Sequence, residues 1–195
     1  MSKFQETKTY QNLINAYAGE SQARNRYTFF ASVAKKAGYE QIAAIFEETA
    51  YNEKEHAKLY YKHIQDNLDE VPNMITVTGT YPIELSDTAA NLLSAAQGEE
   101  DEVVDYTEWS KVAKEEGYDD VARTFRNVAS VEEHHGKRYR ALRDNVLNEK
   151  VFEKEESTEW ICRVCGYIHT GVKAPEMCPT CKHPKAYFEV FCANY

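Results

Sequence analysis

The chain carries the same metal-binding pattern twice, and the two copies are offset by 79 residues. In each copy a single glutamate precedes a Glu-x-x-His motif at the same distance, so the two sets are Glu20, Glu53 and His56, and Glu99, Glu132 and His135. Three further pairs match at this offset: Tyr27 and Tyr106, Gly38 and Gly117, and Phe46 and Phe125. Such a duplication predicts two helix hairpins whose carboxylates and imidazoles meet at one point and bind two metal ions.

The spacing of apolar residues supports the two hairpins. Apolar residues recur at helical spacing in four stretches, at about residues 5–36, 39–66, 86–115 and 118–147. Gly38-Tyr39 and Gly117-Tyr118 lie at the short breaks within each pair, where glycine suits the C-terminal end of a helix. We therefore predict an all-α four-helix bundle over residues 1–148.

The segment between the two hairpins, residues 67–87, is too long for a hairpin turn. It contains Pro72, Gly79 and Pro82, which do not favour a helix. We expect a long crossover between helices 2 and 3 that makes these two helices run parallel. Ser86 and Asp87 are both candidates for the N-cap of the third helix.

The acids of the repeat share helix faces with apolar residues. Glu20 lies at helical spacing from Leu13 and Tyr27, and Glu132 from Phe125, so these carboxylates point toward the core. An unpaired buried carboxylate costs several kcal/mol, and four together repel one another, so cations must accompany them. Oxygen-rich ligation with one imidazole per metal favours iron or manganese over structural zinc. The alternative, an acidic bundle without metal, is disfavoured by the duplication.

Some candidates have no counterpart in the other repeat or have a second interpretation. Glu102 follows Glu99 by three residues and is either an extra ligand or a surface acid, since its counterpart is Ala23. His134 points about 100° away from His135 on a helix, and His63 lies one turn too far along, so neither is expected to bind metal. Two tyrosines either donate hydrogen bonds to the ligating carboxylates or are ordinary core aromatics: Tyr27 and Tyr106.

A second candidate metal site lies near the C-terminus. Two Cys-x-x-Cys pairs, separated by twelve residues, would form a tetrahedral four-sulfur site for zinc or iron: Cys162, Cys165, Cys178 and Cys181. The flanking Cys-Gly-Tyr and Cys-Pro-x-Cys sequences resemble rubredoxin, which favours iron and a one-electron carrier, whereas zinc would be structural. We predict a charged linker at residues 149–158 and a small β- and turn-rich metal-bound domain at 159–195. Cys192 is expected to be a small apolar residue in a terminal strand.

Composition excludes several classes of partner. A net charge of −9 and a pI near 5.2 argue against nucleic acid and anionic membranes, which favour basic surfaces. The sequence has no run of 18 apolar residues, and its N-terminus is polar without an apolar signal core. We expect a cytoplasmic protein, where cysteines bind metal as thiolates more readily than they form disulfides.

Over almost its whole length the chain resembles rubrerythrin. The resemblance rests on Ala18-Gly19-Glu20-Ser21-Gln22-Ala23-Arg24-Asn25-Arg26-Tyr27, the two Glu-x-x-His motifs, Glu-Glu-Gly-Tyr at 115–118 and the rubredoxin-like tail. It implies a ferritin-like bundle and a non-haem di-iron peroxidase that reduces hydrogen peroxide to water in oxidative-stress defence. It also implies an antiparallel homodimer, in which a four-cysteine iron passes electrons from an NAD(P)H-linked reductase to the partner's di-iron centre.

The same resemblance implies the roles of individual residues. Glu53 and Glu132 would bridge the two irons, and the four cysteines would hold the third iron. The di-iron ligands would be Glu20, Glu53, His56, Glu99, Glu102, Glu132 and His135.

The third helix departs from the family pattern. There the family has Glu-x-x-Glu-Trp-Thr-x-x-Tyr, with eight steps from the first Glu to the Tyr. Here seven steps separate Glu99 from Tyr106, so the chain lacks an extra residue of the kind that a π-bulge accommodates. The second Glu of the family motif exchanges with the histidine equivalent to His56 as the irons change oxidation state. In this chain the residue at the position of that second Glu is Glu102 if the motif is aligned on Glu99, or Asp101 if it is aligned on Tyr106. The sequence does not decide between these two acids, or whether the exchange with His56 takes place.

Two other functions fit parts of the sequence. A ferroxidase, iron-handling protein or O₂ reductase of ferritin type would use the same bundle, although iron storage has no need of an attached electron carrier. A metal-stabilised structural or sensing protein would have zinc at the cysteines and would show neither colour nor turnover.

Overall fold

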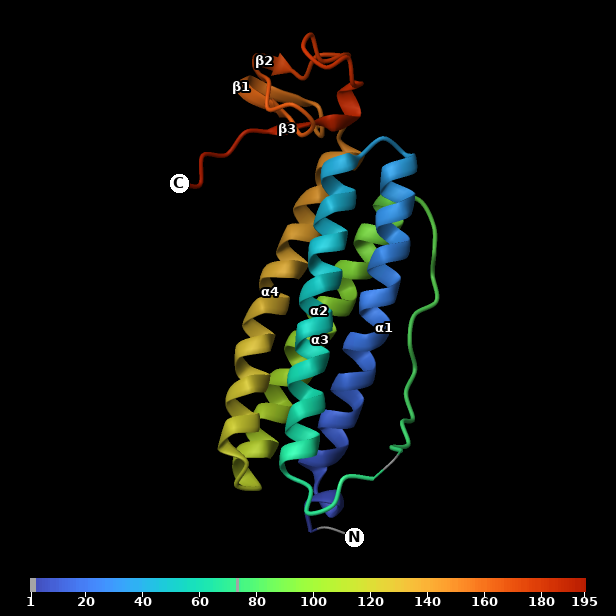
Figure 1. Cartoon of the computed structure of the whole chain (residues 1–195), viewed down its shortest axis with the longest axis vertical. Coiled ribbons are helices and arrows are strands. Elements are labelled where there is room, and N and C mark those ends of the chain that lie inside the picture. The colour runs from blue at the N-terminus through green and yellow to red at the C-terminus, as the bar shows by residue number, and fades with distance from the viewer. Residues whose placement is uncertain (1–2, 73) are drawn as a thin grey trace.

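The computed structural model describes residues 3–72 and 74–195, and its four long helices confirm the predicted bundle (Figure 1). After a short 3₁₀ helix, η1 (Lys3–Glu6), the helices are α1 (Lys8–Lys36), α2 (Glu40–Asp66), α3 (Thr88–Glu115) and α4 (Asp119–Leu147). The first helix thus begins three residues later than predicted, because η1 precedes it. None of the described helices is long and apolar enough to cross a membrane.

The ends of the helices follow from local sequence. Gly38 and Gly117 have φ angles of 84° and 87°, in the left-handed region that favours glycine, and each directly follows the last turn of a hairpin's first helix. Asp87, rather than Ser86, caps α3, since its carboxylate accepts a hydrogen bond from the Ala90 N–H at 2.8 Å. The N-terminus of α1 is also held by Glu116, whose carboxylate accepts from the Lys8 and Thr9 N–H groups at 3.1 and 2.8 Å.

The helices pack as two antiparallel hairpins, α1 with α2 and α3 with α4. The crossover runs up the outside of α1, so α2 and α3 run in the same direction (Figure 1). Helix α3 is α-helical throughout, in agreement with the absence of an extra residue between Glu99 and Tyr106. Two clusters of buried aromatic and aliphatic residues fill the bundle, one centred on Phe46 and the other on Phe125.

A small tail domain follows the bundle. Its strands β1 (Glu153–Cys162), β2 (Ile168–Lys173) and β3 (Phe188–Val190) form an antiparallel sheet in the order β2-β1-β3, with a 3₁₀ helix, η2 (Lys185–Tyr187), before β3. The linker between the bundle and the tail domain is shorter than the predicted residues 149–158, because β1 already begins at Glu153. The strand prediction for Cys192 is wrong: this residue is exposed and follows β3 outside any strand.

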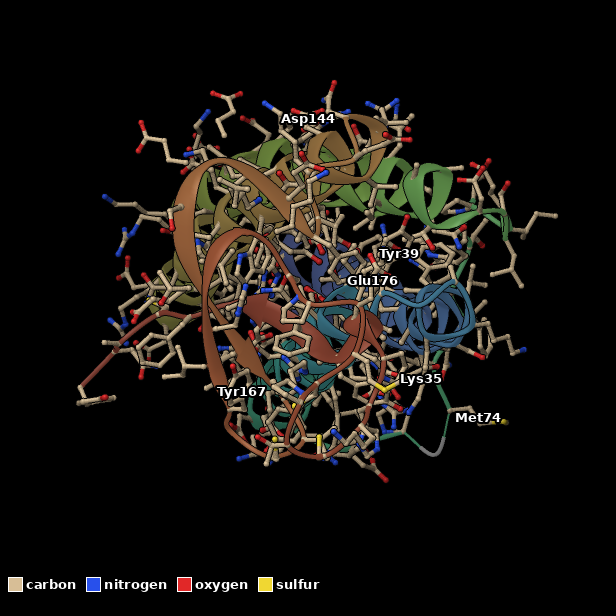
Figure 2. The ribbon with its side chains drawn as sticks, turned by 90° about the horizontal axis from the view of Figure 1, so that it is seen from above. Lys35, Tyr39, Met74, Asp144, Tyr167 and Glu176 are labelled. Atoms are coloured by element: carbon tan, nitrogen blue, oxygen red, sulfur yellow. The ribbon has the colours of Figure 1, made fainter. Side chains whose placement is uncertain are left out.

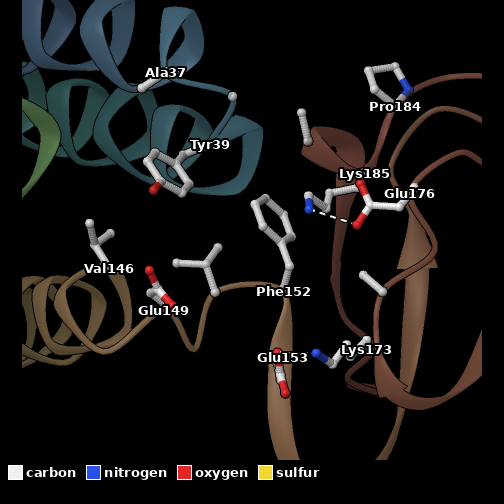
Figure 3. Close-up of a pocket in the computed structure, with 14 residues that line it drawn as sticks. Ala37, Tyr39, Val146, Glu149, Phe152, Glu153, Lys173, Glu176, Pro184 and Lys185 are labelled. Atoms are coloured by element: carbon white, nitrogen blue, oxygen red, sulfur yellow. Dashed lines mark hydrogen bonds and ion pairs between the residues drawn. The ribbon is translucent and has the colours of Figure 1, made fainter.

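The tail domain lies at the end of the bundle where α1 turns into α2 (Figures 1 and 2). Phe152 stacks on Tyr39 with ring centroids 6.0 Å apart and an interplanar angle of 10°. These rings border a cavity of about 590 Å³ between the two parts of the chain, with Lys173, Glu176 and Lys185 on its tail side (Figure 3). The tail domain is therefore held against the α1–α2 turn of its own bundle.

Candidate metal centres

One group of ligand atoms gathers around His56. Its Nδ1 lies 2.9 Å from an oxygen of Glu53, 2.9 Å from an oxygen of Glu132 and 3.7 Å from an oxygen of Glu20. All four residues are buried, and one ligand atom from each lies within 4.8 Å of the others. Helices α1, α2 and α4 each contribute to this group.

A second group gathers around His135 in the same way. Its Nδ1 lies 2.8 Å from Glu132, 3.3 Å from Glu53 and 3.9 Å from Glu99. Glu53 and Glu132 belong to both groups, and each turns one oxygen toward His56 and the other toward His135. We call these six residues the bundle cluster: Glu20, Glu53, His56, Glu99, Glu132 and His135.

The four carboxylates of the bundle cluster are fully buried. Desolvation and the charges of neighbouring carboxylates raise the pKa values of Glu20 and Glu99 well above the ordinary range. Desolvation lowers the pKa of His135, but contacts with Glu132 and Glu53 outweigh it and raise the pKa to about 9. The cluster therefore needs positive charge, which protons or metal ions must supply.

The donor set fits metal ions better than protons. Most close approaches of the His nitrogens to the carboxylates are not hydrogen bonds, and these buried atoms have no hydrogen-bond partner among the described residues: Glu20 Oε2, Glu53 Oε1, Glu99 Oε2, both oxygens of Glu132, and His135 Nδ1. Atoms that converge without hydrogen bonding one another are arranged as ligands of a shared ion. Four carboxylates and two imidazoles form the set typical of di-iron and di-manganese bundles.

Two tyrosines donate hydrogen bonds to the bundle cluster. The hydroxyl of Tyr27 donates to Glu99 at 2.7 Å, and that of Tyr106 donates to Glu20 at 2.7 Å. Each tyrosine thus forms a hydrogen bond with an acid of the other repeat, as the first of the two interpretations of these residues predicts. Such hydrogen bonds fix the orientation of a ligating carboxylate.

Glu102 lies beside the bundle cluster but outside both groups. Its side chain is half-buried, whereas that of Asp101 is exposed. Desolvation, Glu132 and Glu53 raise the pKa of Glu102 well above its usual range, and Arg26 and His56 oppose this rise. His134 is exposed and His63 forms a hydrogen bond with Thr124 at 2.8 Å, so both lie away from the cluster.

The sequence did not single out Arg26, which is 8% exposed and whose guanidinium lies 5.7 Å from the ring centroid of Tyr27. An arginine in a polar stretch of helix looks like a surface residue. The repeat contains one signal, because the counterpart of Arg26 at the offset of 79 residues is an acid, Asp105.

The four cysteines come together in the tail domain. The Sγ atoms of Cys162 and Cys181 are 3.7 Å apart, and those of Cys165 and Cys178 are 3.6 Å apart. Four sulfurs at about 2.3 Å from a tetrahedral metal ion would lie about 3.8 Å from one another, so the residues fit such an ion. Desolvation raises the pKa of Cys178, but backbone N–H groups of Cys181 and Thr180 outweigh it and lower the pKa to about 6, which favours the ligating thiolate.

Comparisons with known proteins agree with both clusters. A family model described as "Rubrerythrin" matches residues 11–143, and one described as "Rubrerythrin, rubredoxin-like domain" matches residues 160–189. Rubrerythrin-1 of Clostridium acetobutylicum is 50% identical over the whole of both chains. Rubrerythrin of Porphyromonas gingivalis is 49% identical over 97% of this chain and 92% of its own.

Solved structures show the same fold. Nigerythrin in a mixed-valence state is 32% identical, with a TM-score of 0.61, and the match covers 98% of this chain and 94% of that chain. A bacterioferritin from Desulfovibrio desulfuricans has a TM-score of 0.60 at 22% identity over 73% of this chain and 82% of its own, which is a likeness of fold alone. The chain belongs to the rubrerythrin family of di-iron oxidoreductases, with a di-iron carboxylate site in its bundle and a rubredoxin-like four-cysteine site in its tail.

Proposed function

We propose that this protein is a peroxidase that reduces hydrogen peroxide to water in oxidative-stress defence. The supporting observation is the presence, in one chain, of a buried two-metal cluster and a separate four-sulfur cluster. A centre that only oxidises iron for storage has no use for an attached one-electron carrier. A centre that turns over on peroxide must be reduced again in every cycle, and electrons from an NAD(P)H-linked reductase would reach it through the four-cysteine iron. A cytoplasmic location suits this reaction, because a reducing compartment keeps the cysteines as thiolates.

The proposed ligand set follows the two groups of the bundle cluster. Glu20 and His56 would bind one iron, and Glu99 and His135 the other. Glu53 and Glu132 would bridge the pair, since each directs one oxygen to each histidine. Glu102 would be the seventh ligand, reached by a movement of its side chain.

Two ferrous ions held in this cluster would supply the two electrons that cleavage of the peroxide O–O bond requires. The protein's own residues would orient the ligands and limit the access of water. Tyr27 and Tyr106 hold Glu99 and Glu20 in place through hydrogen bonds of 2.7 Å. The carboxylates have no exposed surface, and His56 is only 8% exposed, so a small molecule such as peroxide would have preferential access.

The tail domain would serve a partner subunit rather than its own bundle. Glu20 lies 17 residues before Ala37 on α1, which at 1.5 Å per residue places the bundle cluster about 25 Å below the α1–α2 turn. The tail domain, which holds the cysteines, lies beyond that turn (Figure 1). An antiparallel homodimer would bring the tail of one chain close to the bundle cluster of the other.

The proposal is tested by stopped-flow absorption under anaerobic conditions. The fully reduced protein is mixed with one equivalent of hydrogen peroxide per bundle cluster, and the return of the ferric-thiolate colour is followed. We expect the colour to return faster with peroxide than with an equal concentration of O₂. A return that is no faster with peroxide would contradict the peroxidase assignment and favour a ferroxidase or O₂ reductase.

The carrier role of the tail has its own test. Cys162→Ser should stop reductase-driven turnover while a single oxidation of the reduced bundle by peroxide proceeds as before. Cys192→Ser is the matched control, because Cys192 is exposed and lies outside the four-sulfur cluster. Unchanged turnover in Cys162→Ser would remove the carrier role.

A further inference from the structure

Two departures from the internal repeat meet next to the bundle cluster. Glu102 on α3 has Ala23 as its counterpart, and Arg26 on α1 has Asp105. Both Glu102 and Arg26 line a cavity of about 560 Å³ between α1, α3 and the crossover, which we call the α1–α3 cavity. Glu102 of the second hairpin and Arg26 of the first, neither of which has a like residue at the corresponding position of the other repeat, thus share one cavity.

Arg26 is a buried cation, and two of its guanidinium nitrogens have no hydrogen-bond partner among the described residues. Its side chain is 8% exposed, and its Nε and Nη1 have no hydrogen-bond partner among the described residues. The guanidinium lies 5.7 Å from the ring centroid of Tyr27 and 5.9 Å from that of Phe30, which stabilises the charge only in part. A buried cation that stays unpaired is strongly destabilising, so Arg26 requires an anion.

Among the acids that line the α1–α3 cavity, Glu102 is the least exposed. Among the residues that the structure describes, Arg26 is the one cation that lines the α1–α3 cavity. Three acids there, Glu84, Asp101 and Asp105, are exposed to solvent, whereas Glu102 is half-buried. Burial and neighbouring carboxylates raise the pKa of Glu102, and Arg26 and His56 oppose this rise.

Glycines keep the cavity wall open next to both side chains. A Cβ on Gly19 would lie 3.8 Å from Glu102 Oε1, and a Cβ on Gly98 would lie 3.5 Å from Arg26 Nη2. Gly19 and Gly98 are counterparts in the repeat. Each hairpin thus has a glycine next to the residue of the other hairpin that departs from the repeat, Glu102 or Arg26. Any side chain longer than alanine at these positions would press on Glu102 or Arg26.

We propose that Arg26 is a positioning residue that holds the Glu102 carboxylate on the cavity side of the bundle cluster and competes with the metal ions for it. Glu102 then has two places, one paired with Arg26 in the α1–α3 cavity and one on the metal. This inference rests on the proposed function only in taking Glu102 as a ligand.

The test is a double-mutant cycle read out by metal binding. Full-length protein, with zinc retained at the cysteines and the bundle free of metal, is titrated with Mn²⁺, which prefers oxygen ligands. Unbound Mn²⁺ is measured by its EPR signal. Arg26→Leu releases Glu102 to the metal and should tighten Mn²⁺ binding about tenfold, the order expected for one charge-assisted contact. In a Glu102→Gln background the same substitution should change binding by less than about twofold.

The controls separate this role from a general electrostatic or structural effect. Arg24→Leu removes an exposed arginine two residues away and should leave Mn²⁺ binding unchanged. If Arg26→Leu does not fold, Arg26→Lys replaces it in the same cycle, because lysine keeps the charge but not the planar guanidinium. Arg26→Lys should tighten Mn²⁺ binding by a smaller factor, and this tightening must again disappear in the Glu102→Gln background. An equal gain in both backgrounds, or no gain, would overturn the proposal. Since no peroxide is involved, the result is independent of whether the peroxidase test succeeds.

Discussion

The bundle cluster and the cysteine cluster hold metal ligands by different means. The bundle cluster draws its six residues from all four helices, over 116 residues of chain, and large aromatic residues pack on both sides of it. The four cysteines lie within 20 residues of one another. Five buried residues form the hydrophobic core of the tail domain, and two of them are ligand cysteines, Cys162 and Cys178.

This difference determines what each metal contributes to folding. In the bundle, apolar burial by four helices of 27 to 29 residues can hold the fold together, and the metals neutralise charge that the fold has already gathered. In the tail, the core is too small to offset the loss of chain entropy without the metal. The bundle is therefore a preformed site, whereas the tail is a fold that its metal completes.

Removal of both kinds of metal should separate the two regions most strongly. We expect chelation under reducing conditions to unfold the tail domain, because a structural metal supplies on the order of 10 kcal/mol to a domain of this kind, and to leave the helices of the bundle folded. Trp160 is fully buried and donates to the Gly171 carbonyl at 2.9 Å, so its fluorescence should shift to longer wavelength while the helical circular dichroism persists.

The second tryptophan has to be excluded from this measurement. Trp109 lies in the bundle, and its counterpart in the first repeat is Phe30, so Trp109→Phe is a conservative background for the experiment. A simultaneous loss of the helical signal and the Trp160 signal would contradict the distinction between a preformed and a metal-completed site.

The metal-free bundle should be sensitive to pH where the metal-loaded bundle is not. The pKa of His135 is raised to about 9 in the fold, above its ordinary value of about 6.5, so its contribution is fully present below pH 6.5 and is lost as the pH rises through 9. The raised pKa values of Glu20 and Glu99 act in the same direction, because their folded forms also retain protons.

We expect His135 alone to cost the metal-free bundle about 3 kcal/mol, or roughly 10 °C in Tm, between pH 6 and pH 9, and the other groups with raised pKa values to add to this loss. The measurement is thermal unfolding followed by circular dichroism. His134→Gln, which alters the exposed neighbouring imidazole, should keep the full dependence. A Tm that stays level over this range would show that the cluster is neutralised in some other way.

The sequence was sufficient for features that depend on local pattern. The four helices follow from apolar periodicity, and the Glu-x-x-His pairs follow from the helical rise, which places residues three apart on one face. The cysteine pairs depend on a spacing that survives any packing of the surrounding chain. Duplication strengthened these inferences, because chance does not repeat six positions in register.

Features that depend on tertiary packing could not be predicted in this way. The burial of Arg26 depends on how α1, α3 and the crossover enclose a cavity, which no local pattern encodes. The run from Glu153 to Glu156 looked like a linker because it is rich in charged residues, yet it forms the start of β1, in which Glu153 pairs with Lys173 of β2. The Tyr27–Glu99 hydrogen bond joins residues 72 positions apart and depends on how the hairpins dock.

The smallest expected effect concerns the tyrosines that hold the acids of the bundle cluster. Tyr27→Phe and Tyr106→Phe each remove one hydroxyl but keep the ring that packs in the core, so folding stability should change by only about 1 kcal/mol. Without the hydrogen bond to Glu99 or Glu20, metal binding in the bundle should weaken about tenfold, while metal binding by the cysteines stays the same.

Tyr17→Phe is the control, since Tyr17 packs against Tyr61 with ring centroids 5.6 Å apart and its hydroxyl makes no hydrogen bond to the bundle cluster. Mn²⁺ titration measures the effect. If Tyr27→Phe and Tyr106→Phe weaken metal binding equally, both halves of the bundle orient their metals alike, and the difference between the halves lies in Glu102 and Arg26. If neither variant weakens metal binding, Tyr27 and Tyr106 are core aromatics only.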